Sequence, residues 1–597
     1  MRICIATTPI RPHPTPFPPF GSMAIIQAIK KIGESAYFYN IDYHRYKHEQ
    51  IVEYFKGKEF DVVGISAVVS TAYAYTKYLI KLIKDIHPGT IVIVGGNLAA
   101  SAELLHRKAN ADYCVIGDGE IICQNLIKAI KNNKTSDNEL NKIIGITYLN
   151  SKNEFKFTGY DHPLPAPMIE TPDFSILEDD KSIKHYIHKH SEIPTFSPDS
   201  KLDKEKKTAA VIVAKGCVAR CTFCHRFEKG YRVRPLEEII NHMKMLKEKY
   251  NVHYINISDE NFGSYKDETL RLVKKMKEIG LTWKAAGVRA HTVDFQTLEF
   301  WRENGCKLIL YGIESGSPTM LKVMEKKITV EQNIKALKAT YEAGITTKVQ
   351  LVIGMPGETD KTINETINFL LETMPYYSKH FRKKIDYIAS INYAQSLPGT
   401  PLYEYAREKG FIGKDIDSEE KYLLDISDKN ASNKDHFINF TQQPLLKVLS
   451  WRHKIFWILF REHAKVNLKI SLSKLEIFYS FFLMLINKFF KIRLNTPLKK
   501  VFDKYDIESA SYNIEKSQRL ADALRLLMPW NKFTYPFLLI IVAYRESKNY
   551  RFFFRLIFEH LKWSFNISKK INLPNITLRK IVNISDTSES LTIRKGR

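Results

Sequence analysis

The amino-acid sequence predicts an α/β protein with three structured parts: a doubly wound N-terminal domain, a partial or full βα barrel and a mostly helical C-terminal region. Short β-branched runs alternate with helical patterns through the first 130 residues, and a second series of this kind begins after residue 205. The last third is basic and rich in aromatic residues. Alternation of strands and helices is typical of parallel sheets that helices cover on both faces. A chain of 597 residues is long enough for several such domains.

Residues 1–130 are expected to form the doubly wound, Rossmann-like domain. Strand-like runs and helical patterns alternate in this order: Ile3–Ala6, Gly21–Ile32, Ala36–Ile41, Asp61–Ser66, Thr76–Ile86 and Thr90–Val94. Ligands of such sheets bind beyond the carboxyl ends of the strands. Small or polar residues follow those ends, namely Ser66, Gly95, Gly96, Gly117 and Glu120. Glycines there allow a ligand to approach the backbone, although plain turns would also explain them.

Residues 131–205 are expected to be a linker that wraps around the domains and contains few strands. The stretch is polar at its start, rich in proline around residues 163–172 and highly charged near its end. Such composition is typical of loops rather than of packed elements.

Residues 206–412 are expected to form the βα barrel. Predicted strands are Ala209–Ala214, Tyr254–Ser258, Trp283–Gly287, Leu308–Gly312 and Lys348–Ile353, and predicted helices are Leu236–Tyr250, Asp267–Ile279, Val293–Asn304, Val330–Ala343 and Thr362–Thr373. Barrels of this kind bind ligands at the carboxyl ends of their strands. Those ends carry Asp259, Glu260, Arg289, Glu314, Ser315, Gly354 and Pro356. Each has a local explanation as a helix cap or a turn, but their joint occurrence favours a ligand site.

Three cysteines, Cys217, Cys221 and Cys224, lie in a CxxxCxxC pattern directly after the first predicted barrel strand. A structural zinc site needs four ligands, and here only His225 or a distant residue could supply the fourth. A [4Fe–4S] cluster bound by three cysteines keeps one iron open for another ligand, which suits redox chemistry on a small molecule. The pattern therefore favours a catalytic iron–sulfur cluster, with zinc as the alternative.

With Phe223 before its last cysteine, this motif resembles that of the radical S-adenosylmethionine (SAM) superfamily. The resemblance implies that the three cysteines ligate a [4Fe–4S] cluster, that SAM binds its open iron and that Phe223 lies near the adenine. The segments 312–317, 354–359, 258–262 and 288–290 also resemble the family's strand ends. They imply that the strand-end residues, Asp259, Glu260, Arg289, Glu314, Ser315, Gly354 and Pro356, contact SAM.

The N-terminal domain resembles the cobalamin-binding domain that precedes one large class of radical SAM enzymes. Pro18–Gly21, Gly95–Gly96 and Asp112–Glu120 match that pattern. The resemblance implies that Ser66, Gly95, Gly96, Gly117 and Glu120 contact cobalamin. The DxHxxG signature of many cobalamin proteins is missing, and we expect His44 to be a surface loop residue rather than a cobalt ligand.

Residues 413–597 are expected to be a basic, aromatic-rich helical region. Residues 431–597 contain 30 Lys and Arg against 12 Asp and Glu, so about +18 of the formal charge of +25 lies there. The apolar runs are shorter than the ~20 residues of a membrane-spanning helix. Basic and aromatic helices suit either a solvated cap on the barrel or docking to an anionic membrane surface. Nucleic-acid binding is disfavoured, because no recognised motif accompanies the charge.

The sequence shows neither a signal peptide nor a disulfide framework, so we expect a cytoplasmic protein, with peripheral membrane contact as a hypothesis. The resemblance implies a radical SAM enzyme that uses cobalamin to methylate an unactivated carbon. A small-molecule or lipid-like substrate and a flavodoxin or ferredoxin as reductant are the expected partners. The alternative within the enzyme class is a radical cyclisation, rearrangement or oxidation, as in the anaerobic magnesium-protoporphyrin cyclase. A non-catalytic iron–sulfur or zinc module at a membrane surface is the alternative of a different class.

Overall fold

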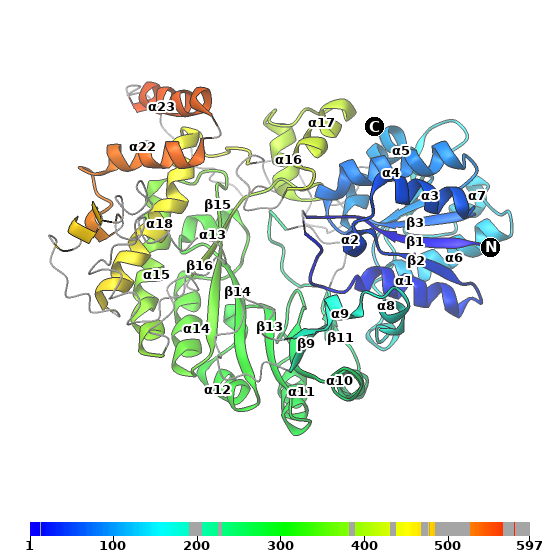
Figure 1. Ribbon diagram of the computed structural model, residues 1–597, viewed down its shortest axis with the longest axis horizontal. Coiled ribbons are helices and arrows are strands. Elements are labelled where there is room, and N and C mark those ends of the chain that lie inside the picture. Colours follow the sequence, from blue (N-terminus) through cyan, green and yellow to red (C-terminus); the bar gives the residue numbers. More distant parts are fainter. Residues whose placement is uncertain are drawn as a thin grey trace.

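The structure is a computed structural model that describes most of the chain. The described residues are 1–11, 13–189, 206–224, 230–380, 389–429, 437–466, 526–547 and 549–564, with a few separate residues between 476 and 524 and at 578. Within them, two sheets of seven strands each form the N-terminal domain and the barrel. Figure 1 shows the first domain in blue beside the green barrel, with yellow and orange helices on the far side of the barrel.

The N-terminal sheet confirms the predicted doubly wound domain. Its strand order is β2-β1-β3-β4-β5-β6-β7, and the first five strands in the chain run parallel. Helices α1 and α6 cover one face, whereas α3, α4 and α5 cover the other. The bounds are β1 (Ile3–Thr7), α1 (Phe20–Lys31), β2 (Ala36–Tyr39), α3 (His48–Gly57), β3 (Val62–Ser66), α4 (Tyr73–Ile86), β4 (Ile91–Gly95), α5 (Ala102–Ala109), β5 (Tyr113–Val115) and α6 (Gly119–Lys131).

The first sheet continues into the stretch that the sequence predicts as a linker. Strand β6 (Ile146–Leu149) pairs antiparallel with β5, and β7 (Phe155–Phe157) pairs antiparallel with β6. The buried side chains Ile146 and Tyr148 belong to the core beneath α6. Two short segments of the predicted linker, 146–149 and 155–157, are thus strands of the first sheet, which the polar residues around them conceal in the sequence.

The second sheet is a partial barrel. Its order is β16-β15-β14-β13-β12-β9-β8, so β16 and β8 are opposite edges that do not pair. Strands β9, β12, β13, β14, β15 and β16 are parallel neighbours and β8 is antiparallel to β9. The strands are β8 (His188–Lys189), β9 (Lys207–Val211), β12 (Val252–Ile257), β13 (Thr282–Val288), β14 (Cys306–Glu314), β15 (Thr346–Ile353) and β16 (Ala389–Tyr393). The outer helices are α10 (Leu236–Tyr250), α11 (Lys266–Glu278), α12 (Phe295–Glu303), α14 (Val330–Glu342) and α15 (Asp360–His380).

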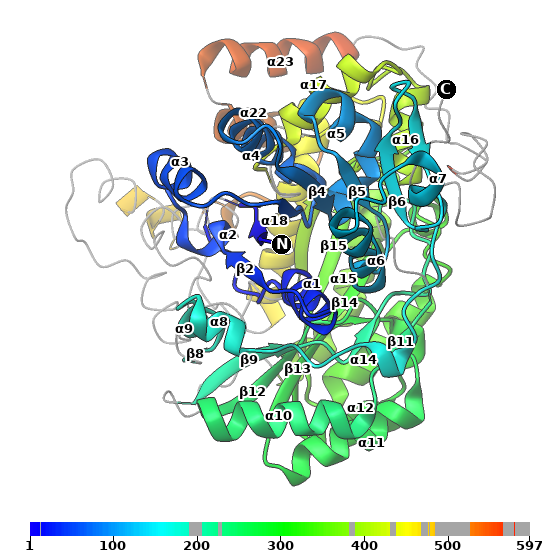
Figure 2. The same cartoon turned by 90° about the vertical axis from the view of Figure 1, so that its right-hand side faces the viewer.

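Helices after the barrel brace both domains. Helix α18 (Leu445–Val466) packs along α15, and α22 (Tyr535–Glu546) and α23 (Tyr550–Ser564) pack on α18. Helix α17 (Ile416–Ile426) instead lies against α4 and α5 of the first domain, as Figure 2 shows from the side. Its Leu423 and Ile426 belong to the core of that domain. The C-terminal region therefore helps to hold the two sheets together.

Replacing Leu423 by Ala is expected to weaken the docking of α17 on the first domain. Leu423 is fully buried, so its truncation should cost about 2–5 kcal/mol. Leu424→Ala on the same helix is the matched control, since Leu424 is 45 % exposed. Urea denaturation followed by fluorescence would measure both variants. Equal stability of the two would contradict the interface.

Candidate functional site

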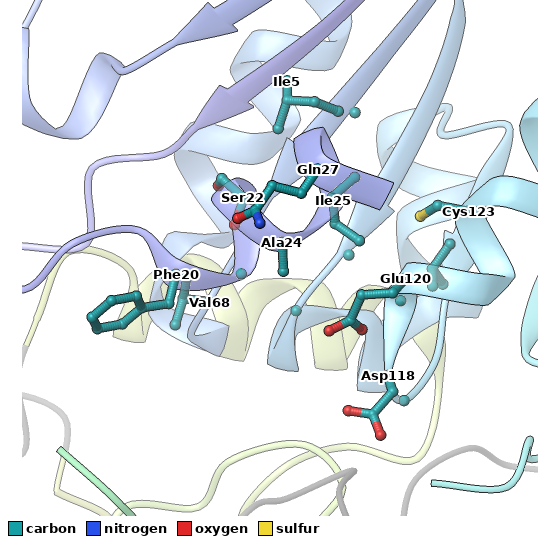
Figure 3. A pocket seen from close by; sticks show the side chains of 18 of the residues that line it. Ile5, Phe20, Ser22, Ala24, Ile25, Gln27, Val68, Asp118, Glu120 and Cys123 are labelled. Carbon is teal, nitrogen blue, oxygen red and sulfur yellow. The ribbon is translucent and has the colours of Figure 1, made fainter. Parts of the chain in front are cut away.

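The carboxyl ends of the two parallel sheets face one cavity of about 420 Å³ (Figure 3). On one side it is lined by the ends of β3, β4 and β5, and on the other by residues that follow β9 and β12. Five residues expected to contact cobalamin line it: Ser66, Gly95, Gly96, Gly117 and Glu120. From the barrel, Lys215, Gly216, Ser258 and Glu260 line the same cavity.

The cavity reaches between the N-terminal sheet and helices α1 and α6, where its walls are apolar. Ile5, Ile25 and Cys123 line this inner part, whereas Asp118 and Glu120 lie at the end that faces the barrel (Figure 3). A Cβ at Gly64 would lie 2.7 Å from Ile5 Cδ1, and one at Gly119 would lie 2.9 Å from Ile25 Cδ1. Glycine at both positions keeps the walls close-packed behind the cavity. The space suits a large ligand with an apolar part inserted under α1 and a polar part facing the barrel.

No histidine lines this cavity among the described residues. His44 lies at the end of α2 (Ile41–His44), where its Nε2 is 3.0 Å from Asp180 O and 3.2 Å from Asp180 Oδ1. The imidazole is half-buried in these contacts and not in an exposed loop. His44 therefore lies outside the cavity, as expected, although its environment is more buried than the sequence suggests.

The three motif cysteines lie on the loop that follows β10 (Ala214–Lys215). This short strand pairs antiparallel with β11 (Arg232–Val233), so the two strands form a stem below the loop. Thr222, fully buried, donates its N–H to Met324 O (3.0 Å) and accepts at its carbonyl from Leu402 N–H (3.0 Å). The loop is thus attached to two elements of the barrel mouth. His225, the local candidate for a zinc ligand, lies outside the described residues.

The cysteine thiols fit an iron–sulfur cluster better than a single ion. Cys217 and Cys221 are half-buried and Cys224 is exposed. In the described part of the chain, no three Cys, His, Asp or Glu side chains are grouped to hold one metal ion. In a four-iron cluster each cysteine binds a different iron, so the three sulfurs need not converge on one point. Three soft donors beside the cations Lys326 and Arg289 suit such a cluster.

Glu314 and Lys326 form a buried pair next to the cysteine loop. Their side chains are 3.5 Å apart, and burial raises the pKa of Glu314 although Lys326 opposes this shift. Burial disfavours the charged form of Lys326, but Glu314, Cys221 and Cys224 raise its pKa overall. Arg289 donates from Nη2 to Lys326 O at 3.4 Å. A carboxylate and two cations at one mouth can bind the ammonium and carboxylate groups of an amino acid.

The backbone around this pair is strained. Glu314, Glu325 and Lys327 have φ of 66°, 51° and 50°, in the left-handed region that non-glycine residues avoid. The register between β14 and β15 also shifts between Gly312 and Glu314. Such strain costs about 1–3 kcal/mol per residue and is concentrated at functional sites. These positions adjoin the Glu314–Lys326 contact.

The loop after β15 is closed by a buried carboxyl group. Glu358 accepts the N–H of Gly354, and burial raises the pKa of Glu358 to about 8. Gly354 has φ of 89°, and a Cβ there would lie 2.1 Å from the ring of Phe437. Pro356 is buried in the same loop, and Phe223 packs in the cluster that contains Met355. The structure thus brings Phe223, which is expected near the adenine, next to a loop that is expected to contact SAM.

Two predicted SAM contacts also have hydrogen-bond partners within the protein. Asp259 Oδ1 accepts the N–H of Val213 at 2.8 Å and so joins the ends of β12 and β9. The hydroxyl of Ser315 lies 3.1 Å from Thr366 Oγ1 of α15. Glu260 lines the cavity shared with the first domain. Arg289 and Glu314 remain at the mouth with the cysteines.

Several residues of the site have no clear sequence signal. Lys326, Lys215 and Arg232 are three of 90 Lys and Arg, and nothing local distinguishes them. Phe437 lies far along the chain from the loop that it covers. Strand β16, the sixth parallel strand, was not predicted either. Only contacts between distant segments identify these residues.

Sequence profiles of two families match the chain. The radical SAM superfamily matches residues 211–370, and the B12 binding domain matches residues 12–127. The protein named uncharacterized methyltransferase PH0819, from Pyrococcus horikoshii, is 30 % identical to this chain over 359 residues. The aligned region covers 58 % of this chain and 69 % of that protein. The anaerobic magnesium-protoporphyrin IX monomethyl ester cyclase of Rubrivivax gelatinosus is 24 % identical over 53 % of this chain and 55 % of its own. The chain thus spans just over half of the cyclase's length.

A solved structure has a similar fold. The cobalamin-dependent SAM radical enzyme OxsB, with aqua-cobalamin and SAM bound, aligns with a TM-score of 0.56 at 16 % identity. The alignment covers 98 % of this chain and 78 % of OxsB. At this identity the likeness concerns the fold alone.

The carboxyl group of Glu358 is expected to make stability depend on pH. Because its pKa is raised to about 8 in the folded state, the native protein binds an extra proton between about pH 4.5 and pH 8. Stability should therefore fall as pH rises through this window, by up to about 1.4 kcal/mol per pH unit. Glu358→Gln removes this dependence. Urea unfolding of both proteins at several pH values measures the difference, and parallel profiles would contradict the assignment.

Proposed function

Because the chain belongs to the radical SAM superfamily and carries a B12-binding domain, we propose that it methylates an unactivated carbon of a small-molecule or lipid-like substrate. The observation that supports this best is the shared cavity, onto which the cobalamin-side residues and the stem of the cysteine loop both open. A carbon placed between the two would be within reach of both cofactors. Methyl transfer between them would then need no large movement of either domain.

We assign the residues of the barrel mouth as follows. Cys217, Cys221 and Cys224 hold the [4Fe–4S] cluster, and Phe223 with the Gly354 loop borders the adenine. The pair of Arg289 and Lys326 suits the SAM carboxylate, and Glu314 suits its ammonium group. When bound, the cluster supplies one electron for cleavage of SAM and cobalamin carries the methyl group. The chain itself orients both and excludes water from the mouth.

We assign cobalamin to the cavity under α1. Ser66, Gly95, Gly96, Gly117 and Glu120 line its polar end, and Ile5 and Ile25 line its apolar end. Since no described lining residue is a histidine, the chain offers no imidazole there for the lower face of cobalt. The reductant would be a flavodoxin or ferredoxin type of protein.

A radical cyclisation is the second candidate within the enzyme class. It is supported by the 24 % identity to the anaerobic cyclase of Rubrivivax gelatinosus. The 30 % identity to a methyltransferase over more of both chains favours methylation. A non-catalytic iron–sulfur or zinc module is disfavoured, since a purely structural metal site does not need the strained, buried Glu314–Lys326 pair.

Anaerobic reconstitution with iron and sulfide, hydroxocobalamin and methyl-labelled SAM tests the proposal. We expect visible absorbance of a [4Fe–4S] cluster and, on reduction, formation of 5′-deoxyadenosine together with labelled product in extracts supplied as substrate source. Cys221→Ala should abolish the cluster and SAM cleavage, whereas Cys306→Ser, at a buried cysteine outside the loop, should keep both. Deoxyadenosine with unlabelled product would favour cyclisation, and SAM cleavage by the Cys221→Ala variant would refute the cluster assignment.

We propose further that helices α22 and α23 contact an anionic membrane surface. Exposed apolar residues recur at helical spacing on α22 (Phe537, Ile540, Tyr544) and on α23 (Tyr550, Phe554, Phe558, Leu561). Arg551, Arg555 and Lys562 are exposed along the same side of α23. Such a face suits the boundary between lipid head groups and acyl chains. None of the described helices is long and apolar enough to span a bilayer.

This helix pair is connected to the barrel mouth. Lys447 of α18 lies with its Nζ 4.5 Å from the ring centroid of Trp563 in α23 and 2.7 Å from Asp360 Oδ2. Asp360 begins α15, directly after the Gly354–Glu358 loop. A membrane at α23 would therefore lie near the mouth, which supports an apolar or lipid-like substrate.

Flotation with vesicles tests the membrane contact. The full-length protein should float with anionic vesicles at low salt and much less with neutral ones, since each basic residue near the surface contributes about 1 kcal/mol. Phe554→Glu with Phe558→Glu should reduce binding by at least about tenfold. Phe295→Glu, an exposed aromatic on α12, is the control. Equal flotation of all three proteins, or none by the wild type, would contradict the assignment.

A further inference from the structure

The stem of the cysteine loop places two positive charges side by side. In the β10–β11 pair, Lys215 lies directly opposite Arg232. Side chains of directly opposed residues lie on the same face of an antiparallel pair, and like charges there destabilise it. Lys215 is followed by Gly216 and Cys217, so this repulsion acts at the base of the loop that carries the cysteines.

Carboxylates of the N-terminal domain compensate for both charges. Arg232 donates from Nη1 to Asp118 Oδ2 at 2.6 Å and to Leu164 O at 2.7 Å. Lys215 donates from Nζ to Glu120 Oε1 at 2.7 Å and lies 3.4 Å from Asp118 Oδ1. The Asp118 side chain is only 5 % exposed, and Lys215 and Arg232 hold its pKa below the usual value despite its burial.

Asp118 contacts the stem of the cysteine loop and does not cap its own helix. It occupies the N-cap position of α6, where an aspartate usually accepts an N–H of its own helix and stabilises it by about 1 kcal/mol. Here its side chain makes no such bond. It accepts instead from Leu164 N–H at 2.7 Å and from the two basic residues of the stem. The geometry of the loop therefore serves the contact between the domains.

Three of these four charged residues line the ligand cavity. They are Asp118, Glu120 and Lys215, and Gly117 and Gly216 lie beside them in the lining. A ligand that contacts the Gly117–Glu120 loop is thus next to the carboxylates that neutralise Lys215 and Arg232 in the stem of the cysteine loop. Linkage requires the converse, so that ordering of the cysteine loop changes affinity for the cavity ligand.

We propose that Asp118 is a positioning residue that couples cobalamin binding to the arrangement of the cysteine loop. Its carboxylate holds Lys215 and Arg232 together, so that the stem of the loop is formed only when the first domain is docked. Occupancy of the cavity stabilises the Gly117–Glu120 loop and, through Asp118, the cysteines. This inference rests on the proposed cobalamin site, but its effect on the stem is independent of any cofactor.

Hydrogen exchange in the cofactor-free, full-length protein tests the cofactor-independent part. Asp118→Asn keeps the shape of the side chain and removes its charge. Exchange in residues 214–215 and 232–233 should become at least about tenfold faster, which corresponds to about 1.4 kcal/mol of local opening free energy. Asp112→Asn is the matched control, since Asp112 also accepts a backbone N–H (Val92, 2.6 Å) and a lysine (Lys84, 2.7 Å) but does not line the cavity. Unchanged exchange in the stem of Asp118→Asn would overturn the proposal.

Coupling is measured as the ratio of hydroxocobalamin dissociation constants before and after reconstitution with iron and sulfide. We expect a ratio of about five to ten in wild-type protein and in Asp112→Asn, and a ratio near one in Asp118→Asn. If the Asp118→Asn substitution only damaged the structure, both dissociation constants would rise by the same factor. The ratio would then equal that of the wild type, and this result would overturn the coupling. Asp118→Glu should restore part of it. If Asp118→Asn does not fold, Glu120→Gln removes the other carboxylate and should show the same loss.

The outcomes separate this inference from the proposed function. Absence of hydroxocobalamin binding by the wild type would refute the proposed cofactor, while the exchange measurement would still decide whether Asp118 holds the stem. Binding with a ratio of one in the wild type would overturn the coupling and leave the proposed methyl transfer intact.

Discussion

In a parallel sheet covered by helices, side chains can contact a ligand mainly at the carboxyl ends of the strands. This constraint organises the molecule. Helices cover both faces of the N-terminal sheet and the outer face of the barrel sheet, and neighbouring strands pair most backbone groups. The carboxyl edge of each sheet is therefore the part left accessible to a ligand. The two edges face the same cavity, so residues as far apart in the chain as Ile3 and Glu260 line one space. The positions of Ser66, Gly95, Ser258 and Glu260 all follow from strand direction.

The burial of ionisable groups is the second constraint. Glu314, Lys326, Asp118 and Glu358 are all withdrawn from water, and each has an ionic or backbone partner. Such pairs rarely add to net stability, because the loss of hydration offsets the attraction. Their value is positional: each pair brings together segments that packing alone would leave free to shift. The left-handed backbone at Glu314, Glu325 and Lys327 shows how much local strain the barrel mouth tolerates for this purpose.

Segments outside the two sheets fix how the sheets meet. Helix α17 follows the barrel in the chain but packs into the core of the first domain, and Tyr73 donates to Glu420 at 2.8 Å across this contact. On the opposite side of the cavity mouth, the Asp118 contacts join the first domain to the cysteine loop. Two separated points of attachment resist rotation of one domain on the other better than a single one would. A cavity shared between domains depends on that resistance.

The sequence by itself determined the class of the protein and most of the elements. Periodicity identified the strands β1, β3, β4, β12, β13, β14 and β15 and helix α10 because these are local patterns of buried side chains. The cysteine motif predicts the chemistry, because three thiols at short spacing suit one iron–sulfur cluster. Strand-end glycines likewise indicated the cavity, and all five residues expected there line it.

Only the tertiary structure decided which polar residues pair with distant segments of the chain. Asp259 and Ser315 have the sequence context of ligand contacts, and their hydrogen bonds to Val213 and Thr366 are visible only in the folded protein. Lys326, Lys215 and Arg232 carry no local signal, because a lysine or arginine in a basic chain is ordinarily solvated. Their partners Glu314 and Asp118 come from other elements or another domain. Pairing across such distances depends on how two sheets are docked, and no local pattern of residues contains that information.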